Sequence, residues 1–95
     1  MIFSKACEYG IRATIYIDQQ SLNHNRVSLK SIANEIDSPE AFTAKILQML
    51  AKNGIVNSNR GARGGSEIKL NKMKTTKLID IVLAIDSSLN DKYVY

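Results

Sequence analysis

A helical segment with a clear start and a clear stop lies near the middle of this 95-residue sequence and limits the folds open to it. Ser38 followed by Pro39 is typical of a helix start, because an N-cap serine accepts a backbone N–H and proline suits the first turn. Gly54 is typical of the residue just past a helix end. We therefore predict a helix from Ser38 to Asn53.

The two faces of this predicted helix differ in the size of their side chains. Apolar residues at three- and four-residue spacing define the face expected to be buried, namely Phe42, Ile46, Met49 and Leu50, with Leu47 at its edge. The opposite face carries small or polar residues, namely Glu40, Ala41, Ala44, Gln48 and Ala51, with Lys45 and Lys52 on a flank. Because alanine adds little bulk, the backbone of this helix can approach a groove of DNA or a groove on a protein.

Two further helices are predicted before this segment. Ser4 is the predicted N-cap of a helix that runs to about Gln20. Its expected apolar face is formed by Cys7, Ile11 and Ile15, flanked by Ala6, Ala13 and Ile17. The polar run 21–26 is expected to be a loop, after which Ser28 caps a short helix with one apolar face, formed by Leu29, Ile32, Ala33 and Ile36.

A change of pattern after Gly54 predicts a β-hairpin. Residues 55–59 and 66–70 have the composition of two short strands, and the intervening Arg60 to Gly65 is rich in glycine, which suits a hairpin tip. Lys72 to Thr76 is expected to connect the hairpin to a last helix from Thr76 to Asp86. The predicted fold class is mainly α with a small hairpin, in the order of a winged helix-turn-helix. We assign residues 1–86 to this domain and residues 87–95 to a tail.

The net charge of +4 is unevenly distributed along the chain. The stretch from Phe42 to Lys77 holds eight Lys and Arg residues and one acid, Glu67, which gives it a net charge of +7. The rest of the chain holds five cations and eight acids, a net charge of −3. Such a concentration of positive charge is typical of a surface that binds nucleic acid. The alternative is that the lysines only keep an exposed surface hydrated.

Other classes of protein are disfavoured. The one histidine, His24, lies in the predicted polar loop, and no serine or cysteine has a companion base, so we do not predict an enzyme. A single cysteine, Cys7, cannot form an internal disulfide or hold zinc alone, and we expect it to be a buried thiol. We expect neither metal nor cofactor to be bound.

Charged residues interrupt the first twenty positions, and no apolar run reaches the roughly 18 residues of a membrane span. We therefore expect no signal peptide, no membrane association and a cytoplasmic location.

Seven segments share their residues, order and spacing with one known family, namely residues 4–10, 27–33, 39–42, 45–47, 50–56, 58–65 and 78–86. They resemble the Rrf2 family of bacterial regulators, which includes iron–sulfur cluster, nitric-oxide-sensing and cysteine-metabolism regulators. The resemblance implies a dimeric winged-helix protein that binds double-stranded DNA and represses or activates transcription. A winged-helix module that binds protein instead of DNA is the alternative, and residues 87–95 are a possible remnant of a dimerisation helix.

The resemblance also implies which residues contact DNA. The helix in the major groove would present Ser38, Glu40, Ala41, Ala44, Lys45 and Gln48. The hairpin, or wing, would present Asn59, Arg60 and Arg63 to the backbone or the minor groove. Backbone N–H groups at helix starts such as Ser28 and Ser38 are suited to binding phosphates of the DNA backbone. Lys5 and Tyr9 are candidate phosphate contacts, and Tyr9 is equally suited to packing between helices.

The sequence departs from the family pattern in three places. No cysteine follows Cys7, so the three cysteines by which longer members hold a cluster are not among these 95 residues. Thr43 stands where leucine is usual, and Ser66 stands where an aromatic residue commonly follows the glycines.

Overall fold

The computed structural model describes residues 4–59 and 64–90. In chain order it consists of α1 (Lys5–Leu22), α2 (Leu29–Ile36), α3 (Glu40–Lys52), β1 (Asn57–Asn59), β2 (Gly65–Glu67), α4 (Leu70–Thr75) and α5 (Leu78–Asn90). The two strands form one antiparallel sheet in which Ser58 pairs with Ser66. This confirms the predicted class, mainly α with a small hairpin. No helix among the described residues is both long and apolar enough to span a lipid bilayer.

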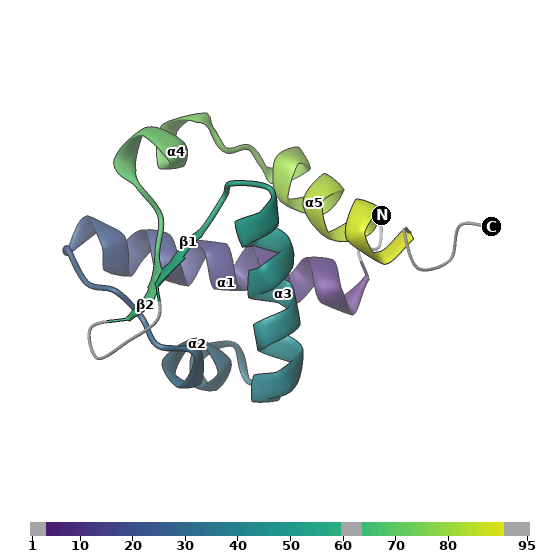
Figure 1. The fold of residues 1–95 in the computed structure, drawn as a ribbon, viewed down its shortest axis with the longest axis horizontal. Coiled ribbons are helices and arrows are strands. Elements are labelled where there is room, and N and C mark those ends of the chain that lie inside the picture. Colours follow the sequence, from purple (N-terminus) through teal and green to yellow (C-terminus); the bar gives the residue numbers. More distant parts are fainter. Residues whose placement is uncertain (1–3, 60–63, 91–95) are drawn as a thin grey trace.

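The helices pack around an aliphatic core in which isoleucine is the most frequent residue. In Figure 1, α3 crosses in front of α1, α2 lies beside the N-terminal end of α3, and the hairpin lies toward the C-terminal end of α1. The large apolar side chains that are almost completely buried come from α1, α2, α3 and α5, namely Ile17, Ile32, Ile36, Ile46, Leu50 and Ile85. The core therefore fixes α3 against α1, α2 and α5, and it leaves one side of α3 free.

Local signals explain where α1 and α2 begin. The Ser4 hydroxyl accepts the Cys7 N–H at 3.2 Å, and the Ser28 hydroxyl accepts the Ser31 N–H at 3.1 Å. Both serines are therefore N-caps, as predicted. The first helix runs two residues further than expected, to Leu22, and shortens the predicted loop.

The turn between α2 and α3 depends on a left-handed residue, Asp37, at φ 54° and ψ 54°. The Asp37 N–H donates to the Asn34 carbonyl at 3.3 Å, and the Ser38 N–H donates to the Ala33 carbonyl at 2.9 Å. This pair of bonds is a Schellman motif, which satisfies the last carbonyls of α2. The prediction that Ser38 caps α3 is wrong by one residue: Pro39 is the N-cap, because its carbonyl accepts the first helical N–H, that of Thr43.

The buried face of α1 differs from the one predicted. Ile15 is 52% exposed and Ile11 is half-buried. Ala6, Cys7, Ala13 and Ile17 are buried as predicted, and Gly10 and Thr14 are buried in addition. The reason is the close approach of α5, whose Ile85 packs against Gly10. On α5 itself the predicted apolar residues divide: Ile81, Val82 and Ile85 are buried, whereas Leu78 and Ile79 are exposed.

The region after the hairpin also differs from expectation. The strands are three residues each, shorter than predicted. The predicted connector 72–76 lies mostly within the short helix α4, which has no buried residue and so gave no apolar periodicity. The last helix, α5, starts two residues later than expected and continues beyond Asp86 to Asn90.

The two residues that depart from the family pattern are both buried. Thr43 is fully enclosed, and its hydroxyl donates to the Pro39 carbonyl at 2.8 Å. Ser66 is 4% exposed, and its hydroxyl lies 3.2 Å from the Ser58 hydroxyl across the hairpin. Each polar group thus has a partner within its own element or hairpin, as buried polar groups require.

Candidate nucleic-acid interface

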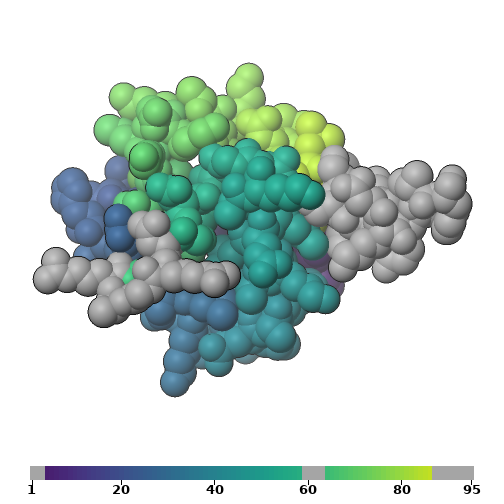
Figure 2. Space-filling view, in the orientation of Figure 1, coloured from purple at the N-terminus to yellow at the C-terminus, as the bar shows by residue number. Residues whose placement is uncertain are grey.

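The outer face of α3 is open to solvent. Figure 2 shows the surface of α3 at the centre of the viewed face, with α2 below it and α4 above it. Glu40, Ala41, Lys45 and Gln48 are exposed, and Ala44 and Ala51 are half-buried. The small outer face expected from the sequence therefore points away from the core, which occupies the opposite side through Thr43, Ile46, Leu47 and Leu50. Thr43 and Leu47 lie nearer the middle of that buried side than predicted, and Phe42 and Met49 lie at its edges.

The hairpin lies directly beside this face. Ala44, Gln48 and Ala51 of α3 line a hollow of about 340 Å³ together with Ser58, Gly65 and Ser66 of the sheet, and with Leu29 and Leu47. The helix and the base of the wing thus form two adjoining walls on one side of the molecule. Asn59 ends β1, but its side chain, like Arg60 and Arg63 at the wing tip, lies outside what the structure describes.

The basic stretch of the sequence does not gather at one place. Lys45 and Lys52 are exposed on α3. Lys69 and Lys72 line a second hollow with Ala51 and Asn57, so they lie next to the C-terminal end of α3. Lys77, by contrast, lines a pocket formed with α1. Four of these lysines, Lys45, Lys52, Lys69 and Lys72, therefore lie on or beside α3. Lys77 lies on another surface.

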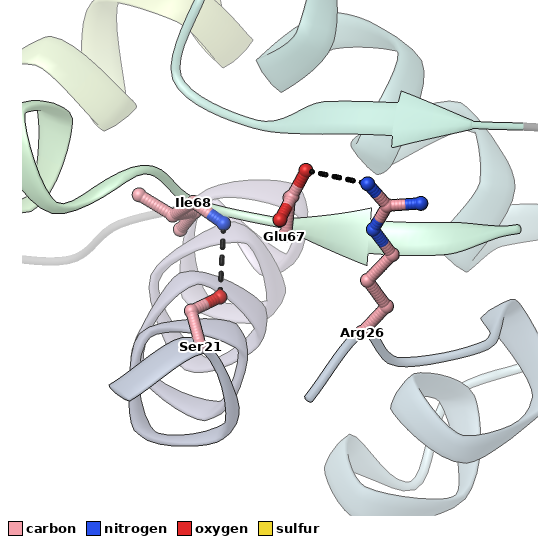
Figure 3. A network of polar contacts seen from close by, with 4 residues as sticks. All are labelled: Ser21, Arg26, Glu67 and Ile68. Atoms are coloured by element: carbon pink, nitrogen blue, oxygen red, sulfur yellow. Dashed lines mark hydrogen bonds and ion pairs between the residues drawn. The ribbon is translucent and has the colours of Figure 1, made fainter. Parts of the chain in front are cut away.

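The only acid of the basic stretch is engaged by an arginine that the sequence analysis did not single out. Figure 3 shows Arg26, in the loop before α2, reaching Glu67 on β2, with 3.2 Å between guanidinium nitrogen and carboxylate oxygen. In the same network the Ser21 hydroxyl, at the end of α1, accepts the Ile68 N–H at 3.0 Å. These two contacts attach the base of the wing to α1 and to the loop before α2, and they reduce the negative field of Glu67.

The remaining predicted residues lie around the starts of the helices. Ser28 is exposed at the start of α2, and Ser38 is half-buried in the turn. Tyr9 packs edge-on against Phe42, with ring centroids 5.6 Å apart, which bears out the packing alternative for its ring. Lys5 and Arg12 lie over the same ring, at 5.7 and 5.8 Å from its centroid. Tyr9 therefore joins α1 to α3 and holds two cations at their junction.

Cys7 is a buried thiol, as expected, with 1% of its surface exposed. Its sulfur donates to Asp86 Oδ1 at 3.1 Å and so links the start of α1 to α5. Burial raises the pKa of the thiol, with the carboxylate of Asp86 acting in the same direction. A thiol in that setting is a poor nucleophile and a poor metal ligand, because both roles require the thiolate.

Comparison with known proteins identifies the family. The Rrf2 family model, described as iron-dependent transcriptional regulators, matches residues 3–92. The chain belongs to the Rrf2 family. An Aquifex aeolicus (strain VF5) protein named as an HTH-type transcriptional regulator is 36% identical over 77 residues, which cover 80% of this chain and 51% of that relative. The chain therefore spans about half the length of that relative.

Solved structures agree with this assignment. IscR of T. potens superposes with a TM-score of 0.77 at 27% identity, over 98% of this chain and 74% of that one. CymR, the global cysteine regulator of B. subtilis, superposes with a TM-score of 0.76 at 26% identity, over 88% of this chain and 64% of that one. The arrangement of α1–α3 and the hairpin is thus that of Rrf2 regulators.

The iron named in the family description requires ligand side chains that lie close together. The part of the chain that the structure describes contains no group of three or more His, Cys, Asp or Glu side chains able to hold a metal ion. Its cysteine is enclosed and protonated, with its hydrogen directed at Asp86. The described residues therefore do not fit an iron or iron–sulfur site.

Proposed function

We propose that this chain is a sequence-specific DNA-binding regulator of transcription. The observation that carries the proposal is the exposed, small-residue face of α3, which adjoins the base of the wing in a member of a regulator family. An α-helix fits the major groove, where each base pair presents a distinct pattern of donors and acceptors. A helix whose outer face is alanine at Ala41 and Ala44 can enter deeply, and this leaves Gln48 and Glu40 within reach of base edges.

The charged residues around α3 have a different part in the proposal. Lys45 contacts a phosphate from the flank of the helix, and Arg60 and Arg63 reach the neighbouring backbone or minor groove. The backbone at the starts of α2 and α3, near Ser28 and Ser38, faces phosphates, with Lys5 at the start of α1 as a further contact. Tyr9 contributes to DNA binding indirectly, because its packing on Phe42 holds α1 and α3 in position.

We propose further that the regulator acts as a homodimer in the cytoplasm. Two copies with a two-fold axis would read two half-sites of a palindrome. Membership of the Rrf2 family favours this function over a module that binds only protein. Sedimentation equilibrium of the 95-residue chain, alone and with bound DNA, measures the number of copies directly.

The first experiment is selection of bound fragments from genomic DNA at one fixed salt concentration. We expect enrichment of a short palindromic motif, because a dimer imposes its symmetry on the site. Recovery of fragments with no shared motif, together with a strictly monomeric chain, would contradict both sequence-specific binding and dimerisation.

A matched pair of lysine variants then tests the interface. Lys45→Ala removes an exposed charge from α3, whereas Lys77→Ala removes the same charge from the pocket beside α1. We expect Lys45→Ala to weaken binding and to lower the slope of log K against log salt by about one unit, because one phosphate contact is lost. Lys77→Ala should leave that slope unchanged. Equal slopes for both variants and the parent would exclude a phosphate contact at Lys45.

A bulk variant tests the close approach of α3. Ala41→Leu preserves helix propensity but adds volume at an exposed position of the outer face. We expect it to reduce affinity for the selected motif much more than affinity for unrelated DNA, since only the specific complex needs the helix deep in the groove. Gln19→Leu, at an exposed position of α1, adds an apolar side chain away from α3 and should change neither. Unchanged discrimination in Ala41→Leu would show that α3 does not enter the groove.

A further inference from the structure

A second hollow lies where the C-terminal end of α3 meets α4, and both helices border the face shown in Figure 2. Its volume is about 230 Å³, and we call it the α4 hollow. Two lysines, Lys69 and Lys72, and two asparagines, Asn57 and Asn71, form the polar part of its lining. None of the described residues that line it is an acid. A wall with two positive charges and amide donors favours an anion.

The positive charge of the α4 hollow is not neutralised by neighbouring acids. Neither lysine forms an ion pair with another described residue. Glu67 shares a neighbouring pocket with Lys69, but its carboxylate lies 3.2 Å from the guanidinium of Arg26. Asp80 shares another pocket with Lys72, and its carboxylate accepts the backbone N–H just before α5 at 2.8 Å. Both acids thus have partners of their own, and the two ammonium groups are available to an anion.

The α4 hollow continues the surface that we assign to DNA. Ala51 lines both the α4 hollow and the hollow between α3 and the wing. Helix α3 has 13 residues and is therefore about 20 Å long, whereas the major groove is about 12 Å wide. If Ala41 and Ala44 enter the groove, Ala51 lies about 10 Å further along the helix axis. The C-terminal end of α3 then reaches the edge of the groove, where the phosphates of one strand run.

The end of α3 would repel a phosphate if it were not compensated by cations. A helix C-terminus carries a partial negative charge, and lysines in its last turn offset it. Lys52 lies in that turn of α3. The Lys72 Nζ atom lies 3.7 Å from the position that a Cβ atom on Gly54, just past the helix end, would occupy. Compensation of the helix end explains Lys52 and Lys72, whereas Lys69 adds a positive charge beyond that need.

We propose that the α4 hollow binds a phosphate of the DNA backbone beside the groove that α3 enters. Lys69 and Lys72 supply the charge, and Asn57 and Asn71 supply amide donors. This inference rests on the proposed function and extends the DNA contact from α3 and the wing to α4. It also gives a role to α4, which contributes no buried residue to the core. A free phosphate presents the same chemistry, so the experiment has to distinguish the two sources.

Two double variants, each lacking two lysines, test the contact on the full 95-residue chain and the selected DNA motif. Lys69→Ala with Lys72→Ala removes both charges of the α4 hollow. We expect it to lower the slope of log K against log salt by about two units, because two cations no longer meet phosphate. The control is Lys74→Ala with Lys77→Ala. Lys74 is exposed on α4 but lies outside the lining of the hollow, so the control should keep the slope of the parent.

Neutral methylphosphonate linkages, placed one at a time along the DNA, locate the phosphate itself. We expect one position in the backbone beside the motif to weaken binding of the parent and of the Lys74/Lys77 control. The same linkage should have no effect on the variant that lacks Lys69 and Lys72, because its partner is gone. Equal effects of every linkage on the parent and on that variant would refute the contact.

Titration with inorganic phosphate in the absence of DNA tests the other source, followed by amide chemical shifts in NMR spectra. We expect no saturable shift at Gly54, Asn57 or Lys69, because one phosphate lacks the rest of the DNA contact. Saturable shifts there, with the salt slope on DNA unchanged by loss of both lysines, would assign the hollow to a small phosphorylated ligand and overturn the proposal.

Failure of this inference is distinguishable from failure of the proposed function. If Lys45→Ala lowers the salt slope but loss of Lys69 and Lys72 does not, α3 binds DNA and the α4 hollow does not. If the parent selects no motif and Lys45→Ala has no effect, the proposed function itself is wrong, and this inference with it. Lys69→Ala alone, which keeps Lys72 at the helix end, repeats the test with an expected loss of about one unit of slope if the double variant does not fold.

Discussion

Gly10 offers the sharpest test of how α1 and α5 are held together. A Cβ atom built on Gly10 would overlap the Ile85 Cδ1 atom well inside van der Waals contact, and it would lie 3.5 Å from Ile85 Cγ1 and 3.6 Å from Ile81 Cγ2. The backbone of Gly10 is helical, so its glycine serves close approach and not an unusual conformation. Because Ile85 is fully buried, its methyl group has little room to move away.

The expected magnitudes follow from two opposing effects. Overpacking a core by one methyl group costs about 1–3 kcal/mol. Replacing a helix-interior glycine by alanine returns about 1 kcal/mol. We therefore expect Gly10→Ala to lower the free energy of unfolding by about 1 kcal/mol. Ile85→Val removes the overlapping Cδ1 and leaves a small void, at a cost of about 1 kcal/mol.

The double variant distinguishes overlap from other causes. In Gly10→Ala with Ile85→Val, the new methyl group occupies the space left by Cδ1, so both the overlap and the void disappear. Because the helix gain from alanine remains, we expect its stability to match that of the parent or to exceed it by up to about 1 kcal/mol, which corresponds to a coupling energy of about 2–3 kcal/mol. Urea unfolding followed by far-UV circular dichroism measures all four proteins, with a common slope as the check on two-state behaviour. Losses that simply add in the double variant would refute the contact between Gly10 and Ile85.

Three further predictions concern single residues. Burial raises the pKa of Asp18 in the folded chain, so folding favours its protonated form. The stability contributed by this group is therefore lost as the pH rises through its raised pKa in the folded chain. Asp18→Asn should therefore gain stability relative to the parent between about pH 3 and pH 7, as measured by unfolding at both values, and a pH-independent difference would contradict the burial of its charge. Asp37 is left-handed, so Asp37→Gly should raise the melting temperature by relieving about 0.5 kcal/mol of strain while Asp37→Ala lowers it, and the reverse order would contradict the turn geometry. The Arg26–Glu67 pair is partly exposed, so Glu67→Gln should change the free energy of unfolding by less than about 1 kcal/mol, and a larger loss in urea unfolding would mean that the pair holds the wing.

The parts of the fold that sequence reasoning reached are those governed by neighbours along the chain. Ser4 and Ser28 cap helices because each hydroxyl meets an N–H three residues ahead. The outer face of α3 is small because its alanines recur at helical spacing. The start of α3 was misplaced by one residue because the Ser38 N–H closes α2, a use that the Ser-Pro pair does not reveal.

The buried face of α1 was misread for a non-local reason. Spacing alone favours Cys7, Ile11 and Ile15, yet the face that α5 covers centres on Gly10, where a missing side chain permits close packing. A glycine inside an apolar helix has no hydrophobic signal of its own, and its partner Ile85 lies far along the chain. The exposed Ile15 then lines a surface pocket between α1 and α5 and is not a core residue.

The position of the wing was equally out of reach of local patterns. It depends on the Ser21–Ile68 and Arg26–Glu67 contacts, which join residues 47 and 41 positions apart, and on the pairing of Val27 with Ser66. Val27 and Ser66 exchange both backbone hydrogen bonds, at 2.8 and 3.0 Å, so the segment before α2 forms an isolated antiparallel bridge to β2. The side chain of Ser66 is buried, and its hydroxyl lies 3.2 Å from the hydroxyl of Ser58 on the other strand. The base of the wing is therefore fixed to the same segment that starts α2. A shift of that segment moves the helix-turn-helix and the base of the wing together, which is the geometry required of two elements that grip one duplex.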